Sequence, residues 1–158
     1  MALFDDFETP SRWEIVTDGV MGGASTARMA AGREDGSAHV ALRGRVSTAR
    51  GGGFVMLRRQ VDGLPPDVTG IMLDVRGNGG RYEVHLTTSH GTRPWHHYAA
   101  SFTAPRGWTQ IDMPLSAFTA QGWGMTAPLW PPEVTSVAVV AIGRDHDAAV
   151  DVRRIILR

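Results

Sequence analysis

Histidines gather in one part of the chain, where they could bind a transition metal. His85, His90, His96 and His97 follow one another closely, and neutral imidazole nitrogens are common metal ligands. If His85 and His97 lie on paired strands, their side chains can approach each other across the hairpin. Neighbouring strand residues point to opposite faces, so His96 and His97 cannot both bind one ion without a bulge. No carboxylate lies at a supporting spacing, and we therefore expect surface histidines and no metal site.

A second cluster, Asp145-His146-Asp147, offers oxygen ligands. A calcium ion needs six or more oxygen atoms, and this stretch supplies few of them. Asp is also frequent in turns, because its short side chain bonds to nearby backbone amides. The sequence leaves two interpretations open: a hairpin turn between the last two strands, or a structural cation bound here or beside Asp5 and Asp6.

The sequence contains no motif of an established enzyme class. There is no Gly-x-Ser-x-Gly elbow, His-Glu-x-x-His helix or P-loop, and the glutamates are scattered rather than paired for glycoside hydrolysis. All sixteen basic residues are arginine, which excludes a Schiff-base lysine, and the absence of cysteine excludes thiol catalysis. We therefore predict a protein that is not an enzyme and that needs no cofactor.

Charge and hydropathy narrow the classes of partner. Sixteen basic and sixteen acidic residues cancel, so no net field recruits nucleic acid. The N-terminal MALFDDFETP contains Asp5 and Asp6 and lacks the apolar core of a secretory signal. The longest apolar run, residues 137–142, is too short to span a membrane. We expect one domain over residues 1–158, located in the cytoplasm, with neither nucleic-acid binding nor membrane insertion.

The elements that would position these side chains are strands, because apolar residues recur with a period of two. Clear alternation occurs within residues 40–42, 54–58, 71–75, 82–86 and 98–102. Residues 137–142, apolar on both faces, predict a central strand covered on both sides. Asn78-Gly79 predicts a hairpin between two strands, and residues 114–118 predict one helical turn. Many short strands with nineteen glycines and nine prolines favour an all-β, jelly-roll β-sandwich.

Two glycine-rich stretches accompany this pattern, residues 13–25 (WEIVTDGVMGGAS) and 51–54 (GGGF). In the first stretch, Asp18 and Ser25 could line a ligand or partner surface, or Asp18 could satisfy the turn itself. We favour the structural role, in which Asp18 accepts hydrogen bonds from loop amides while the glycines supply positive φ angles.

Two adjacent arginines, Arg58 and Arg59, follow the second glycine stretch and should point to opposite faces of a strand. The one that faces the sheet interior needs an acidic partner, because a buried arginine is rarely left unpaired. Asp18 and Asp74 are the partners we expect. We favour a structural ion pair, with Asp18 and Arg58 as polar staples at one end of the sandwich.

Several motifs resemble the complex I intermediate-associated protein 30 family, in the family's order and over nearly the whole chain. They are Trp13 with Asp18-Gly19-Val20-Met21-Gly22-Gly23-Ala24-Ser25, then Arg43-Gly44-Arg45-Val46-Ser47, Gly52-Gly53-Phe54 with Arg58, Gly77-Asn78-Gly79 with Arg81-Tyr82, and Tyr98, Phe102, Trp108, Pro114-Leu115 and Phe118. Asn78 stands where the family often has aspartate.

This resemblance implies a galactose-binding-domain-like β-sandwich, in agreement with the strand pattern. Mitochondrial members of the family are assembly chaperones for respiratory complex I, and related sandwiches include carbohydrate-binding modules attached to glycanases. The family pattern also implies that Trp13 and Trp108 belong to the core.

The other aromatic residues are candidates for binding. Trp123 and Trp130 lie in the longest predicted loop, where they either cap an end of the sandwich or contact a sugar or a protein. Trp95, His97 and Tyr98 form a second candidate surface.

The predicted function is a non-catalytic binding module. The leading hypothesis is a protein partner, such as a subunit of a respiratory complex during assembly, and the alternative is carbohydrate bound on an aromatic stacking surface. Coplanar exposed aromatic rings on a concave sheet would favour a sugar, whereas an apolar patch would favour a protein. The predicted binding residues are Asp18, Ser25, Arg58, Trp95, His97, Tyr98, Trp123 and Trp130.

Overall fold

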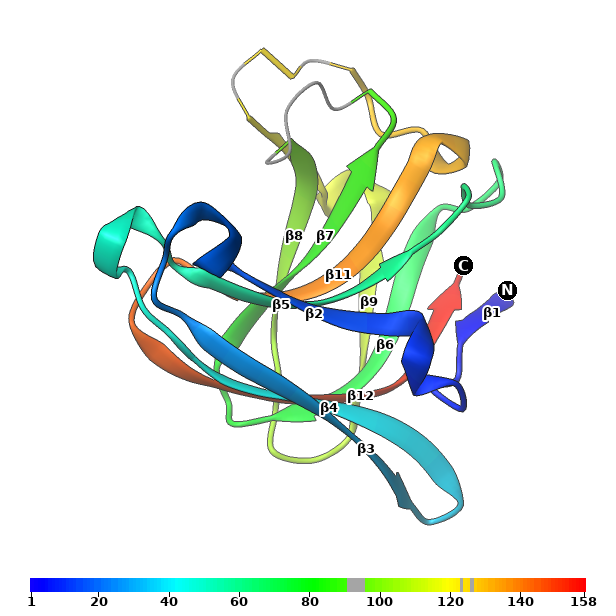
Figure 1. Cartoon of the computed structure of the whole chain (residues 1–158). Coiled ribbons are helices and arrows are strands. Elements are labelled where there is room, and N and C mark those ends of the chain that lie inside the picture. Colours follow the sequence, from blue (N-terminus) through cyan, green and yellow to red (C-terminus); the bar gives the residue numbers. More distant parts are fainter. Residues whose placement is uncertain (91–95, 123, 126) are drawn as a thin grey trace.

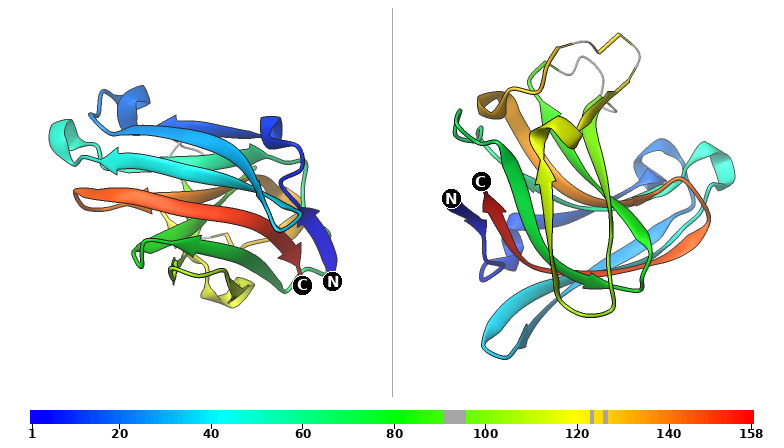
Figure 2. Two further views of the ribbon diagram at one scale, coloured as in Figure 1. Left: turned by 90° about the horizontal axis from the view of Figure 1, so that it is seen from below. Right: turned by 180° about the vertical axis from the view of Figure 1, so that it is seen from behind.

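In the described part of the chain, twelve strands form two antiparallel sheets that pack face to face, as the sequence predicts (Figure 1). The computed structural model describes residues 1–90, 96–122, 124–125 and 127–158, so the predicted binding residues Trp95 and Trp123 lie outside the described part. Figure 2 shows the two layers from below and from behind. The helices of the described part are short 3-10 turns, and none of them has the length and apolar character needed to cross a membrane.

Each sheet contains six strands, and the chain passes repeatedly from one sheet to the other. Sheet A has the order β3-β4-β12-β6-β9, with β1 also paired to β12. Its strands are β1 (Ala2–Asp5), β3 (Thr26–Glu34), β4 (Ser37–Val46), β6 (Gly70–Gly77), β9 (Thr109–Pro114) and β12 (His146–Leu157). Sheet B has the order β10-β8-β7-β11-β5-β2. Its strands are β2 (Trp13–Thr17), β5 (Phe54–Gln60), β7 (Arg81–Thr88), β8 (His97–Thr103), β10 (Thr119–Gln121) and β11 (Val134–Ile142).

Strand β11 lies inside sheet B, between β7 and β5. Val137, Val139 and Ala141 belong to the core between the sheets, while Ala138 and Val140 are buried on the opposite face. The prediction of a central, buried strand is therefore confirmed, whereas within the described ranges the outer face of β11 carries no second layer of the sandwich and lies at a groove.

The two tryptophans assigned to the core by the family pattern differ in position. Trp13 is buried and stacks on Phe7 with ring centroids 4.9 Å apart. Trp108 is half-buried between the guanidinium groups of Arg76 and Arg153, which lie 4.6 and 4.3 Å from its ring centroid. The core assignment of Trp108 is wrong, because the ring is partly exposed, lies outside the core cluster and contacts two arginine guanidinium groups.

The predicted Asn78-Gly79 hairpin is also wrong, because this turn carries the chain from β6 in sheet A to β7 in sheet B. Asn78 nevertheless shapes the turn: its Oδ1 accepts hydrogen bonds from the Gly80 amide at 3.1 Å and from the Tyr82 hydroxyl at 2.8 Å. Gly79 has a φ of 80°, which favours glycine. The turn signal correctly marks a reversal, but it does not identify the strand that follows as a pairing partner.

In the Asp145-His146-Asp147 stretch, Asp145 ends the turn that leads from β11 in sheet B to β12 in sheet A, and His146 and Asp147 begin β12, so the stretch is not a hairpin. Asp145 Oδ1 accepts hydrogen bonds from the Thr48 amide at 2.7 Å and from the Thr48 hydroxyl at 3.0 Å. These bonds lower the pKa of Asp145 and tie the turn to the loop before η3 (Ala49–Gly51).

Five 3-10 turns complete the described elements. Turn η4 (Leu115–Ala117) confirms the predicted helical turn at residues 114–118. Turn η2 (Asp18–Met21) lies beside η3 at one end of the sandwich (Figure 1). The remaining two are η1 (Pro10–Arg12) and η5 (Pro131–Glu133).

Candidate binding groove

The outer face of sheet B carries a groove whose side chains are placed by strand register. Arg58 on β5 lies opposite Ala138 on β11, and Ala138 lies opposite His85 on β7. His85 in turn lies opposite Ala99 on β8. Because side chains alternate along a strand, these residues share the face that points away from the core. Ala138 and Ala99 have short side chains and form the bottom of the groove, and longer side chains around them form its walls.

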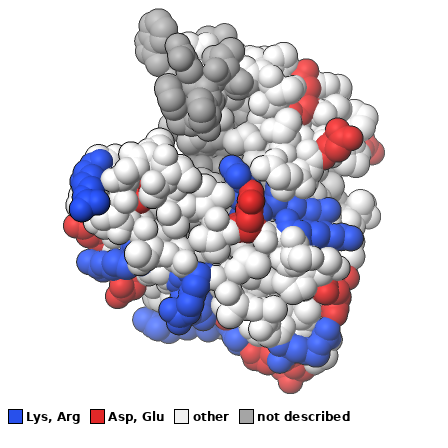
Figure 3. Space-filling view, in the orientation of Figure 1, with Lys and Arg blue, Asp and Glu red and all other residues white. Residues whose placement is uncertain are grey.

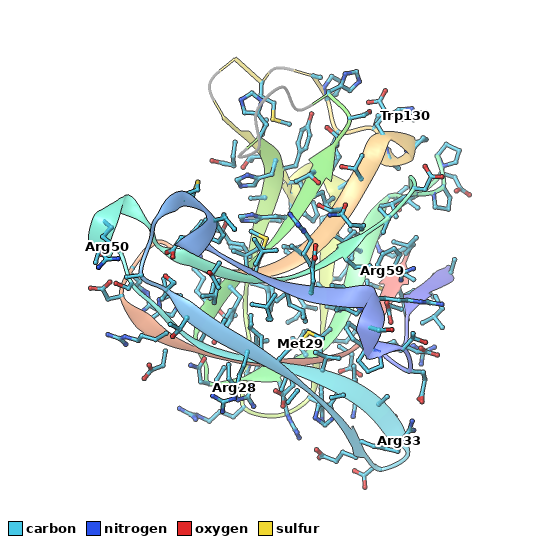
Figure 4. All side chains as sticks on the ribbon, in the orientation of Figure 1. Arg28, Met29, Arg33, Arg50, Arg59 and Trp130 are labelled. Carbon is cyan, nitrogen blue, oxygen red and sulfur yellow. The ribbon has the colours of Figure 1, made fainter. Side chains whose placement is uncertain are left out.

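One half of the groove is mainly apolar and has a volume of about 330 Å³. Its lining includes Phe54 and Met56 on β5 and Val20 and Met21 on η2. Val20 and Met21 are 77% and 61% exposed, so they form an apolar lip at the mouth of the groove. In Figure 3 the lobe around η2 and η3 is largely uncharged except at its outer rim, where Figure 4 places Arg50.

The other half of the groove is polar and has a volume of about 500 Å³. Its polar lining consists of Arg81, Glu83, His97, Ser101, Thr119 and Gln121. His97 and Ile142 line both halves. The two halves therefore form one continuous surface across the strands of sheet B, apolar toward β5 and polar toward β8 and β10.

His85 and His97 meet on the floor of this groove. Their rings stack with centroids 3.9 Å apart and planes inclined by 15°, which is the cross-strand approach that the sequence indicates. Stacked rings present their faces to each other, so their in-plane nitrogen lone pairs do not converge on one point as the ligands of a single ion must. Within the described ranges, no three potential ligands are grouped so that they could hold a metal ion.

Charged groups at the centre of the groove are paired within the protein. His85 Nε2 lies 2.8 Å from Glu83 Oε1, and this hydrogen bond holds the pKa of Glu83 below its usual value although burial opposes the shift. Arg58 donates from Nε and Nη2 to Glu14 Oε1 on the edge strand β2, at 3.0 and 2.8 Å. The carboxylates of Glu83 and Glu14 are therefore both hydrogen-bonded to side chains of the same chain.

Asp18 is the first residue of η2 and is fully buried. Its carboxylate accepts hydrogen bonds from the Ser25 amide and hydroxyl at 3.0 and 2.6 Å, and from the Gly53 and Phe54 amides at 2.5 and 3.2 Å. Burial by itself would raise the pKa of Asp18, but these hydrogen bonds together lower it below its usual value. Asp18 and Ser25 are thus buried residues that join η2 to the start of β5 and hold the apolar lip in place.

The prediction that Asp18 and Asp74 pair with Arg58 and Arg59 is wrong. Each of these arginines forms an ion pair with a different carboxylate. Arg58 bonds to the edge strand as described, and Arg59 Nη1 lies 2.8 Å from Asp5 Oδ2. Asp18 cannot serve as their partner because backbone amides and a hydroxyl already surround it. Asp74 pairs with a different arginine on β12.

Two other predicted binding residues do not reach the groove. Tyr98 is buried, and its hydroxyl donates to a loop carbonyl. Trp130 is 48% exposed but lies on the opposite side of the molecule from Arg50 and η3 in Figure 4, outside the lining of the groove. Arg58 and His97 are the predicted residues that do line it.

Sequence reasoning does not single out Val20, Met21, Met56 or Glu83. The period-two pattern places Met56 and Leu57 on opposite faces of one strand, but both are apolar, so the pattern does not say which face is covered. One sequence feature could have predicted the lip. Val20 and Met21 are large apolar residues within a glycine-rich turn, and turns usually lie at the protein surface.

Comparison with known proteins identifies a family and a fold. The family model described as complex I intermediate-associated protein 30 matches residues 2–151. No curated protein matches the chain significantly.

Similar solved structures include carbohydrate-binding modules. A family 11 module from Clostridium thermocellum, in complex with a β-1,3-1,4-mixed-linked tetrasaccharide, has 17% identity and a TM-score of 0.79, covering 99% of this chain and 94% of that one. The family 11 module of the cellulosomal cellulase Lic26A-Cel5E of Clostridium thermocellum has 16% identity and a TM-score of 0.78, covering 98% and 92%. A family 30 module of the cellulosomal cellulase Cel9D-Cel44B of Clostridium thermocellum has 11% identity and a TM-score of 0.59, covering 82% of each chain. These likenesses confirm the predicted jelly-roll β-sandwich.

Proposed function

Because the chain belongs to the complex I intermediate-associated protein 30 family, we propose that it is a non-catalytic module that binds a protein partner in the groove of sheet B. We place that partner among the subunits of a respiratory complex during its assembly, since the family name refers to an intermediate of complex I. The chain then acts by holding a partner surface rather than by transforming a substrate.

The observation that supports this proposal most is the apolar lip. Val20 and Met21 are exposed although both are large apolar residues, and they continue inward to Met56 and Phe54. Exposed apolar surface of this kind is typical of protein contact sites, and methionine adapts its shape to different partner side chains. The described aromatic residues that line the groove do not form a flat platform of coplanar rings, since Phe54 and the stacked His85–His97 pair are the only ones.

Substitution of the lip tests the proposal. In the Val20→Ser/Met21→Ser variant we expect the protein partners captured by the wild-type chain from its source cells to be lost, while the melting temperature stays unchanged because both side chains are exposed. The matched control is Leu3→Ser, which replaces another exposed apolar residue on β1, 52% exposed and outside the groove. Equal capture by the wild type and the lip variant would refute this site.

Carbohydrate binding is the second candidate function, and the polar half of the groove favours it. Thr119 and Gln121 project from the edge strand β10 beside Ser101 and could donate hydrogen bonds to sugar hydroxyls. One similar structure contains a mixed-linked tetrasaccharide. Retarded migration in gels containing mixed-linked β-glucan, abolished in Gln121→Ala, would establish this function, and unretarded migration would remove it.

A further inference from the structure

Two arginines, Arg81 and Arg144, lie at the margin of the groove. Arg81 begins β7 and Arg144 lies in the turn between β11 and β12, and both are exposed. In the described part of the chain, neither side chain forms an ion pair, whereas most arginines on both sheets do. Together with Glu83, Ile142 and Gly143, they line a small hollow of about 170 Å³.

This hollow has an excess of positive charge. The single carboxylate in its lining, Glu83, is hydrogen-bonded to His85 at 2.8 Å, and the charge of Arg81 contributes to lowering the pKa of Glu83. Two guanidinium groups thus face one carboxylate, and within the described ranges neither of them forms an ion pair, so the hollow can accept an external anion. Guanidinium binds carboxylates through two parallel hydrogen bonds, which makes arginine well suited to recognise an acidic side chain.

The hollow is continuous with the apolar half of the groove. Ile142 lines both of them, and Glu83 and Arg81 also line the polar half. A ligand that fills this surface must therefore carry a negative charge close to apolar groups. A protein segment with Asp or Glu beside aliphatic or methionine side chains has this composition.

We infer that the groove binds an acidic and apolar segment of a partner protein, whose carboxylate pairs with Arg81 and Arg144 while its apolar side chains pack on Phe54, Met56 and Met21. This inference rests on the proposed protein-binding function and specifies the chemistry of the partner. Positive charge at the margin also accelerates encounter with an acidic partner, so the association rate falls as the salt concentration rises.

A display library of short random peptides tests the inference on the full chain. We expect the selected peptides to be enriched in Asp or Glu next to apolar residues. A synthetic copy of a selected peptide should bind the Arg81→Gln/Arg144→Gln variant about tenfold more weakly, since two exposed ion pairs are lost. The control variant Arg28→Gln/Arg154→Gln changes two exposed arginines of sheet A that form no ion pair with any described residue, and it should bind as the wild type does.

Other outcomes overturn the inference and separate it from the proposed function. Selected peptides without acidic enrichment, bound equally by the Arg81→Gln/Arg144→Gln variant but lost in Val20→Ser/Met21→Ser, refute the acidic segment and leave the protein-binding groove standing. A different result would refute both the acidic segment and the protein-binding groove. In that case no peptide is enriched, and the chain binds polygalacturonate in a way that requires Arg81 and Arg144, which identifies the ligand as an anionic glycan. Unchanged amide NMR spectra away from the substitutions establish that each variant is folded.

Discussion

Ser25 donates its hydroxyl hydrogen to Asp18 Oδ2 at a distance of 2.6 Å, and the same hydroxyl oxygen accepts the Ser47 amide at 2.9 Å. Through this pair, η2, the start of β3, the end of β4 and the start of β5 are held together at one end of the sandwich. The exposed lip of the groove is the outer surface of the same η2 turn. A buried network of hydrogen bonds around Asp18 and Ser25 thus positions the exposed lip formed by Val20 and Met21.

Replacing Asp18 should lower stability before it affects binding. Asp18→Ala removes an ionised acceptor and leaves buried amide donors without partners, at a cost of about 3 kcal/mol. For a chain of this size the melting temperature should fall by roughly 6–12 °C. Calorimetry of Asp18→Ala, with the exposed Asp62→Ala as a control, measures this. A folded Asp18→Ala protein with the wild-type melting temperature would contradict the structural role.

Gly52 should be intolerant of a side chain because it packs against Asp18. A Cβ atom there would lie 2.5 Å from Asp18 Oδ2 and 2.7 Å from its Cγ. We expect Gly52→Ala to cost about 2 kcal/mol, and to cost less in the Asp18→Ala background, where the clashing carboxylate is gone. Urea unfolding of the two single variants and the double variant measures this coupling. Gly107→Ala is the control, since a Cβ at Gly107 meets no atom within 4 Å, and additive effects at Gly52 and Asp18 would argue against the contact.

Acid should weaken the hydrogen-bond network around the Asp18 carboxylate. The pKa of Asp18 is lower in the folded chain than its ordinary value of about 3.9. The ionised carboxylate therefore stabilises the fold fully above that ordinary value, and the contribution is lost as the pH falls through the folded pKa. The difference in unfolding free energy between the wild type and Asp18→Asn should be largest at neutral pH and should narrow below about pH 4. A difference that stays constant on acidification would be inconsistent with an ionised Asp18.

Trp108 should contribute to stability but not to binding. Its ring lies between Arg76 and Arg153, and Arg76 is also bonded to Asp151 and Glu34. Trp108→Ala removes two cation–π contacts and should lower the unfolding free energy by about 2 kcal/mol. Partner binding should be unaltered, because Trp108 is not among the residues that line the groove. Unchanged urea unfolding, or loss of partner binding in a folded variant, would contradict this account.

The fold follows largely from the sequence, because strand alternation and turn residues act locally. Period-two patterns identify β6 and β7, and the continuous apolar run identifies β11. The link between β6 and β7 is not predictable in the same way, since Asn78-Gly79 specifies a reversal without specifying which sheet the chain enters next.

The groove is less predictable than the fold because it depends on contacts between distant segments. Asp18 is correctly interpreted as a turn acceptor, but its bonds to Gly53 and Phe54 require knowledge of how the two glycine stretches meet. The pairing of Arg58 depends on the register of β2 against β5, which places Glu14 opposite it. Aromatic residues attract attention in a sequence, whereas exposed Val20 and Met21 become evident only once their surroundings are known.

Site-specific photocrosslinking tests the central claim, that the groove of sheet B is a protein-binding surface. A photoreactive phenylalanine analogue is introduced at Met56, in the groove, and separately at Arg154, an exposed position on sheet A. On irradiation in the source cells, we predict a covalent adduct with a partner protein from position 56 and none from position 154. The absence of an adduct from position 56, or the same adducts from both positions, would contradict the claim.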